Sequence, residues 1–322
     1  MPEGHSVHRI ALQFARHFVD KKVSASSPQG RFGDARLIDG QFLKSSYAVG
    51  KHLFLEFDSE LVLHVHLGIY GAWDFAGNVA LDDTAATAGG RMGQTAGKGT
   101  VVGKHEDSLG SIGAPRRTRL RIGEAELQRG TPINFPPEPI GQVRVRLLTT
   151  DAVADLRGPT VCEILDAAAV IMVRGELGPD PLVDPKGEER FMERISRTGT
   201  PIGRAIMNQK IVAGIGNVYR AEMLFRAKLD PFLPANTLPS ETIRALWKDW
   251  VKLLKVGVET GQMLTMDGMS GTELRAALAN REDRHWVYRR AGEPCRVCGA
   301  TIVMDIMEAR KLYFCPKCQG VK

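Results

Sequence analysis

The stretch CRVCGATIVMDIMEARKLYFCPKCQ, residues 295–319, decides how the end of this chain folds. It contains two Cys-x-x-Cys pairs, Cys295 with Cys298 and Cys315 with Cys318, with sixteen residues between them. Each pair can turn two thiolates toward one Zn²⁺ ion, and two pairs complete a tetrahedral site that leaves no position for water. The spacing therefore predicts one structural zinc ion, and the strand-like runs between the pairs predict a β-hairpin held at its base. The alternative is four reduced cysteines without metal.

The predicted hairpin is rich in basic residues, and the chain as a whole is basic too. The chain has 322 residues, a formal net charge of +6, and an ordinary globular composition with 25% charged and 43% hydrophobic residues. This length suits two or three domains, and the positive charge favours a polyanionic partner, although many basic proteins bind none. No apolar run approaches the ~20 residues that a membrane span needs, and the first residues lack a signal-peptide core, so we predict a cytoplasmic protein with no membrane partner.

A glycine-rich turn lies upstream, in NQKIVAGIGNVYRAE, residues 208–222. Gly214 and Gly216 precede a helix expected to begin near Asn217, and amides at a helix N-terminus bind anions. The stretch lacks the Lys-Ser/Thr of a nucleotide-binding loop, so we predict a phosphate of a nucleic-acid backbone as its anion. A tight turn between two helices, without a ligand, is the alternative.

The remaining sequence divides into a strand-rich and a helix-rich part. A helix over 2–19 and strands over 40–50, 51–58, 60–75, 141–150 and 154–165 predict a β-sandwich. The range 76–140 is predicted to be a flexible insertion, since it has few large apolar residues. Helices are expected over 187–198, 201–208, 217–229 and 239–261, the last with Ser240 as N-cap and Gly261 as stop, followed by a loop over 262–285.

These motifs, in this order, resemble the formamidopyrimidine-DNA glycosylase/endonuclease VIII family. That family begins Met-Pro-Glu, has a Gly-Ile-Gly-Asn-like turn in a helix–two-turn–helix domain, and ends in a four-cysteine zinc hairpin closing on Cys-Gln. The resemblance implies an α+β multidomain fold. We expect an N-terminal helix plus β-sandwich over 1–176, a helix–two-turn–helix domain over 177–285 and a zinc β-hairpin over 286–322.

The resemblance also implies a catalytic role for the N-terminus. Removal of Met1 would leave Pro2 with a free α-amine, whose ordinary pKa near 8 keeps a fraction unprotonated at neutral pH. By resemblance, the Pro2 nitrogen attacks C1′ of a damaged nucleotide, and the resulting iminium permits strand cleavage by elimination. Glu3 would move protons at the deoxyribose, and Lys51, in the family's Gly-Lys strand, would hold a phosphate or assist proton transfer.

Four further residues match the family's DNA contacts. Asn217 and Arg310 correspond to its phosphate-binding residues, and Ile69 and Tyr70, after "HLG", to the side chains that fill the space left by a base that has moved out of the stack. The implied partner is double-stranded DNA with oxidised bases or abasic sites, with single-stranded DNA left open, bound by a monomer.

Two departures bear on substrate. Ser6 stands where the family often has a second Glu, and the Arg-Arg-Phe-Gly loop of the branches acting on oxidised purines is missing. The sequence therefore favours the endonuclease VIII branch of actinobacterial type, which acts on oxidised pyrimidines, with oxidised purines as the alternative. Two rival functions stay open: a non-catalytic zinc-hairpin DNA-binding protein, and an enzyme of another class that uses Pro2 as a general base.

Overall fold

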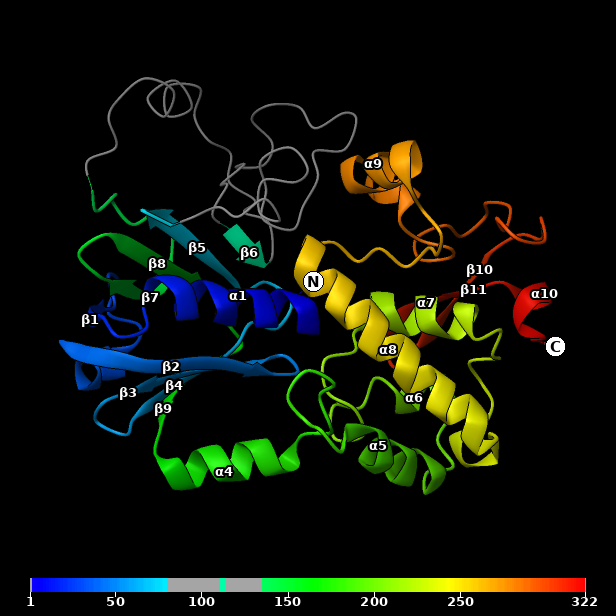
Figure 1. Cartoon of the computed structure of the whole chain (residues 1–322), viewed down its shortest axis with the longest axis horizontal. Coiled ribbons are helices and arrows are strands. Elements are labelled where there is room, and N and C mark those ends of the chain that lie inside the picture. Colours follow the sequence, from blue (N-terminus) through cyan, green and yellow to red (C-terminus); the bar gives the residue numbers. More distant parts are fainter. Residues whose placement is uncertain (1, 80–110, 114–134, 322) are drawn as a thin grey trace. The chain divides into compact units, whose positions relative to one another are not determined.

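The computed structural model describes residues 2–79, 111–113 and 135–321 (Figure 1). The chain divides into two compact units: Met1–Pro2 with Ser6–Gly175 forms unit 1, and Glu3–His5 with Glu176–Lys322 forms unit 2. The two units are described separately. Among the described residues, no helix is long and apolar enough to cross a membrane.

Unit 1 is the predicted helix and β-sandwich. Helix α1 (Gly4–His17) is followed by strands that pair antiparallel in the order β6-β5-β8-β7-β1-β2-β3-β4-β9. Strand β1 pairs with β2 on one side and with β7 on the other, so hydrogen bonding continues from one layer of the sandwich into the next. Figure 1 shows these strands beside α1. The strands are β1 (Lys22–Ser26), β2 (Gln41–Val49), β3 (His52–Phe57), β4 (Val62–His66), β5 (Ala72–Gly77), β6 (Ser111–Gly113), β7 (Val143–Leu148), β8 (Ala152–Arg157) and β9 (Val161–Leu165).

The core of unit 1 forms because α1 lays an apolar stripe against the sheets. Phe14 lies with its ring centroid 4.9 Å from those of both Phe18 and Trp73, and 5.2 Å from that of Phe75. All four rings are buried, and edge-to-face packing of this kind stabilises a core beyond its buried area. A 3₁₀ turn, η1 (Gly33–Leu37), and helix α4 (Ala167–Glu176) complete the elements of this part of the chain.

Unit 2 carries the helical region and the zinc hairpin. Its elements are α5 (Gly187–Ser196), α6 (Ile202–Ala205), α7 (Asn217–Arg226), η2 (Ala235–Thr237), α8 (Ser240–Thr260), α9 (Gly271–Ala279), η3 (Arg281–Asp283), β10 (Val303–Met307), β11 (Arg310–Phe314) and α10 (Pro316–Gln319). Trp247 and Trp250 of α8 lie in one apolar core with Phe191 of α5 and Tyr219 of α7. A second core joins α7 to the hairpin through Phe225, Tyr313 and Cys315.

The structure corrects several expectations. The loop predicted over 262–285 contains helix α9, and Ser240 is the first residue of α8 and makes no capping bond, whereas Gly261 ends α8 with φ +67° as predicted. The run 154–165 is interrupted at Gly158, after which the chain leaves β8 and forms β9 in another part of the sheet. Within the predicted insertion, residues 111–113 form β6, while most of that range, with its basic run at 116–121, lies outside the described residues.

Candidate active site and metal centre

The carboxylate of Glu3 occupies the N-terminus of helix α7. Its Oε2 accepts hydrogen bonds from the amides of Gly216, at 3.0 Å, and Tyr219, at 3.4 Å, and its Oε1 accepts one from Val218 at 2.9 Å. Glu3 is fully buried, and the positive end of the helix dipole stabilises its charge. The turn does bind an anion, as the sequence predicted, but these amides hold the protein's own carboxylate rather than a phosphate.

Glycines allow this close approach. A Cβ on Gly216 would lie 2.3 Å from Cδ of Glu3, and one on Gly4 would lie 2.9 Å from Cα of Gly214. The Gly4 amide donates to the Gly214 carbonyl at 2.9 Å, and Gly214 has φ +92°. The turn therefore needs small residues on both sides to hold Glu3.

Asn217, the first residue of α7, joins this helix to the zinc hairpin. Its Nδ2 donates to the carbonyl of Lys311 at 2.8 Å, and its Oδ1 accepts a bond from Nη2 of Arg220. Asn217 is buried, so both ends of its carboxamide are engaged within the protein. The predicted phosphate contact of Asn217 stays a prediction.

Arg220 and Arg310 line one cavity of unit 2. The cavity has a volume of about 380 Å³, and Arg204 contributes a third guanidinium to its wall. Burial, and then the charge of Arg310, lowers the pKa of Arg220 to about 10. Sequence reasoning missed Arg220, although its place three residues after Asn217 puts both on one face of a helix.

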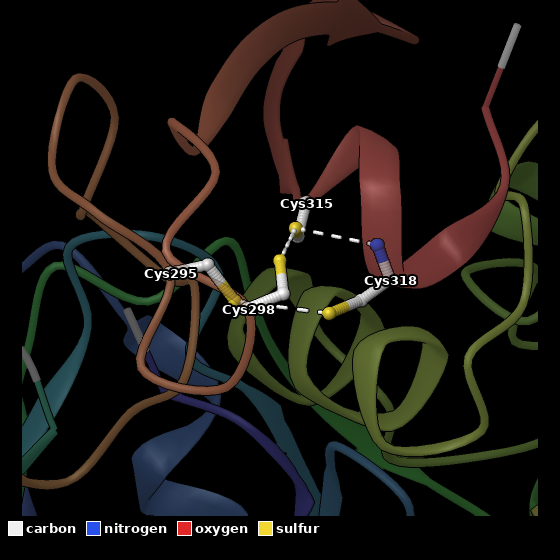
Figure 2. A group of neighbouring side chains, drawn as sticks. All are labelled: Cys295, Cys298, Cys315 and Cys318. Atoms are coloured by element: carbon white, nitrogen blue, oxygen red, sulfur yellow. Dashed lines mark hydrogen bonds between the residues drawn. The ribbon is translucent and has the colours of Figure 1, made fainter.

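Four sulfur atoms lie together at the base of the hairpin (Figure 2). The Sγ atoms of Cys295, Cys298, Cys315 and Cys318 all lie within 4.8 Å of one another, with 3.4 Å between Cys298 and Cys315 and 3.9 Å between Cys295 and Cys318. A tetrahedral zinc site with Zn–S bonds of about 2.3 Å has edges of about 3.8 Å, so these thiolates fit one Zn²⁺ ion. The predicted structural zinc site is confirmed.

The hairpin places Arg310 through an unusual turn. Strands β10 and β11 pair with Met307 opposite Arg310, and Glu308 and Ala309 form the two-residue turn between them. Both turn residues have φ +55°, a conformation that normally selects glycine or asparagine. Glu308 also forms an ion pair with Nε of Arg204 at 2.6 Å.

The other predicted site residues belong to unit 1. Lys51 is half-buried in the turn between β2 and β3. Ile69 and Tyr70 are 52% and 78% exposed in the turn after β4, where Gly71 donates to the carbonyl of Leu67 at 2.9 Å and closes the loop. Other large apolar side chains are exposed to a similar degree, Ile171 at 72% and Met172 at 73% among them, so the predicted contact of Ile69 and Tyr70 with DNA stays a prediction.

Three histidines share a face of β3 and β4 beside Lys51. His52 Nδ1 lies 2.8 Å from His64 Nε2, and His64 Nδ1 lies 2.9 Å from Oε1 of Glu163. Burial, followed by the neighbouring positive charges, lowers the pKa of His52 to about 3 and that of His66 to about 4. Among the described residues, the cysteine group is the one whose donor atoms lie close enough together to hold a metal ion. The three histidines are therefore not arranged as metal ligands; they form a histidine array, in which His64 bonds His52 and Glu163 and the ring of His66 lies against that of His52.

Glu222 anchors the segment that leads into the hairpin. Its fully buried carboxylate accepts bonds from the amides of Trp286, Val287 and Tyr288 at 2.8–2.9 Å and from the hydroxyl of Thr265. Burial raises the pKa of Glu222, while these bonds oppose the rise. The structure gives this side chain a positioning role, since it holds the backbone of residues 286–288.

Three family models match the chain. The formamidopyrimidine-DNA glycosylase N-terminal domain matches residues 1–101, the formamidopyrimidine-DNA glycosylase H2TH domain matches 177–267, and the zinc finger found in FPG and IleRS matches 292–321.

Individual relatives and a solved structure point the same way. Endonuclease 8 1 of Mycobacterium tuberculosis is 38% identical over 320 residues, which cover 99% of this chain and 100% of that protein. The formamidopyrimidine-DNA glycosylase of Thermus thermophilus is 35% identical over 144 residues, covering 45% of this chain and 54% of that protein. The crystal structure of a Lactococcus lactis FPG mutant with Fapy-dG containing DNA has the same fold, with a TM-score of 0.69, 19% identity and 99% coverage of both chains.

Proposed function

The chain belongs to the formamidopyrimidine-DNA glycosylase/endonuclease VIII family, in its endonuclease VIII branch, and we propose that it works through the amine of Pro2. It is a DNA glycosylase of base-excision repair. The proposal adds a second activity, cleavage of the strand at the abasic site, and a preference for oxidised pyrimidines.

The observation that carries the proposal is the anchorage of Glu3 on α7. Three amides hold its buried carboxylate, so the residue that follows Pro2 has a fixed place, and Pro2 with it. A fixed amine next to a fixed carboxylate is what nucleophilic catalysis requires, because the reacting groups need no further ordering.

In the proposed reaction the chain's residues have separate tasks. The Pro2 nitrogen forms a bond to C1′ while the bond from C1′ to the base breaks, and the departing base takes up a proton. The bond from C1′ to the ring oxygen O4′ then breaks, O4′ takes up a proton, and C1′ becomes an iminium with the Pro2 nitrogen. The iminium makes the C2′ proton acidic, and loss of that proton expels the 3′ phosphate as the C3′–O bond breaks. Glu3 holds or moves protons at the deoxyribose, and Lys51 holds a phosphate. The zinc ion, bound by four cysteines, holds the hairpin together and takes no part in these steps.

Borohydride trapping tests this proposal. Purified zinc-loaded protein is mixed with labelled duplex DNA containing an abasic site, and borohydride reduces any iminium to a stable adduct. We expect an adduct with the wild type and none with Pro2→Gly or with a form extended at its N-terminus. Binding without an adduct in the wild type would contradict the proposal and favour a non-catalytic DNA-binding protein.

The preference for oxidised pyrimidines needs a separate measurement. It is supported by the missing Arg-Arg-Phe-Gly loop and by the similarity to Endonuclease 8 1. Release of bases from duplexes with one oxidised pyrimidine or one oxidised purine should be faster for the pyrimidine. Faster release of the purine would assign the chain the opposite specificity within the same family.

A further inference from the structure

Helix α8 packs against the start of helix α1 at Gly257, and we propose that Gly257 and Tyr219 are positioning residues for Glu3. Gly257 leaves the room in which Tyr219 and His5 hold the segment 3–5, so that the Glu3 carboxylate has one place during the reaction. The role of Glu3 in the reaction rests on the proposed function, whereas the packing of this segment does not.

The segment 3–5 belongs to unit 2, and each of its residues makes a close contact that involves a glycine of that unit. An added Cβ would lie 2.3 Å from Cδ of Glu3 if placed on Gly216, 2.9 Å from Cα of Gly214 if placed on Gly4, and 2.9 Å from Cβ of His5 if placed on Gly257. The turn before α7 and the last part of α8 therefore pack against the same three consecutive residues.

Gly257 is required for space and not for conformation. Its backbone is helical, so alanine could adopt it, and alanine favours a helix more than glycine does. A Cβ there would lie 2.3 Å from Oη of Tyr219, and 2.9 Å and 3.1 Å from Cβ and Cγ of His5. The glycine thus weakens α8 locally but lets this helix approach the start of α1.

Neither neighbour of Gly257 can move aside alone. Tyr219 is 0% exposed, and its ring makes edge contacts with Trp250, at 4.8 Å between centroids, and with His5, at 5.6 Å. The Cβ of His5 is fixed to the backbone, and the amide of the preceding residue donates to the turn before α7 at 2.9 Å. A displacement at Gly257 is therefore passed on to the segment 3–5.

Tyr219 also contacts Glu3 directly. Its amide donates to Oε2 of Glu3 at 3.4 Å. Burial, followed by the charge of Glu3, raises the pKa of Tyr219, so its phenol stays neutral close to the carboxylate. One residue thus holds Glu3 through its backbone and His5 through its ring, and Gly257 sets the position of that ring.

The experiment compares two glycines whose neighbours differ, in the full zinc-loaded chain. Gly257→Ala and Gly187→Ala both force a Cβ against a buried ring, the second at 2.6 Å from Trp247 of α8. Both should lower the urea midpoint, because added volume in a packed core strains it. Base release from labelled duplex DNA should slow in Gly257→Ala alone, by about tenfold to a hundredfold, since a small misplacement of a reacting group costs this much.

Rate constants are measured in single turnovers at saturating protein, where they do not depend on the fraction of protein that is folded. Loss of folded protein alone would therefore leave the rate constant unchanged, whereas a misplaced Glu3 lowers it while DNA affinity is kept. A wild-type rate constant in Gly257→Ala would overturn the proposal. An equal loss in Gly187→Ala would also overturn it, because general loosening of α8 would then explain both.

A second pair of variants tests the same link if Gly257→Ala does not fold. Tyr219→Leu removes the ring that contacts His5 and adds no atom in its place. Phe191→Leu, in the same apolar core, is its control. The rate constant should fall in Tyr219→Leu and stay near that of the wild type in Phe191→Leu; equal rate constants would overturn the proposal.

Base release is measured without borohydride, so failure of the two proposals can be told apart. A wild type that releases the base but gives no trapped adduct would contradict the chemistry proposed for Pro2, and the comparison of the glycine variants would still hold. A wild type that is trapped, beside a Gly257→Ala protein that reacts as fast, would contradict this inference alone.

Discussion

Replacing Gly216 by alanine should dislodge Glu3 from the N-terminus of α7. The added Cβ would lie 2.3 Å from Cδ, 2.5 Å from Cγ and 2.6 Å from Oε1 of Glu3, closer than real Cβ atoms approach any neighbour. Either the carboxylate or the helix must move, and both movements break the bonds from the Gly216 and Val218 amides.

The expected cost follows from those bonds. A buried carboxylate that loses its donors costs about 3–5 kcal/mol. If the N-terminal residues instead detach and the carboxylate reaches water, the loss is that of the charge-assisted bonds alone, about 1.5–3 kcal/mol each. We therefore expect the free energy of unfolding to fall by about 3–5 kcal/mol, together with a large loss of borohydride trapping, since Pro2 would lose its fixed place.

Urea unfolding followed by tryptophan fluorescence measures the first quantity, because three of the four tryptophans, Trp247, Trp250 and Trp286, lie in unit 2. Gly199→Ala is the matched control, since a Cβ there would meet its nearest atom, on Asn236, at 3.8 Å. A Gly216→Ala protein as stable as this control, and trapped as well as the wild type, would refute the account of how Glu3 is held.

Three further predictions concern the metal, Glu222 and the histidine array. Chelation should release one zinc ion per chain and unfold the hairpin, measured by a colorimetric zinc assay and circular dichroism; an unchanged spectrum after release would contradict a structural role. Glu222→Gln should lower the free energy of unfolding by about 2–4 kcal/mol in urea titrations, because an amide group would face the backbone donors at 286–288; a change below about 0.5 kcal/mol would argue against the anchor. The lowered pKa values of His52 and His66, about 3 and about 4, mean that the unfolded chain binds more protons below pH 6.5. Stability should therefore fall from about pH 6.5 down to about pH 4, and His52→Asn should flatten this fall in urea midpoints measured at pH 7 and pH 5; an equal fall in both proteins would exclude His52 as its source.

The parts of the fold that the sequence predicts well are those with a short-range signal. The cysteine spacing identifies the zinc site, and the apolar pattern of 239–261 identifies α8, because both depend on neighbours along the chain. Helix α9 was missed because its sequence, GTELRAALA, is short and has little apolar periodicity, so its place depends on contacts made elsewhere. Strand β9 was merged with β8 for the related reason that pairing partners far apart in sequence decide where each strand lies.

The candidate site shows the same limit. Glu3 was expected to be important from its place beside Pro2, but its contact with residues 216–219 joins positions more than 210 residues apart. Arg220 and Glu222 carry no motif that separates them from ordinary helix residues, and their roles depend on burial and on partners in the hairpin region. Such roles follow from tertiary structure and not from spacing.

The turn of the zinc hairpin has a consequence for the order in which this region folds. Glu308 and Ala309 both occupy a left-handed conformation that costs L-residues roughly 1–2 kcal/mol each. A hairpin that begins at its turn is thus disfavoured here, and closure must proceed from the other end, after the cysteine pairs have captured the metal. Newly made chains would then acquire Arg310 in its final place only as a last step, so zinc supply would set when the hairpin is completed.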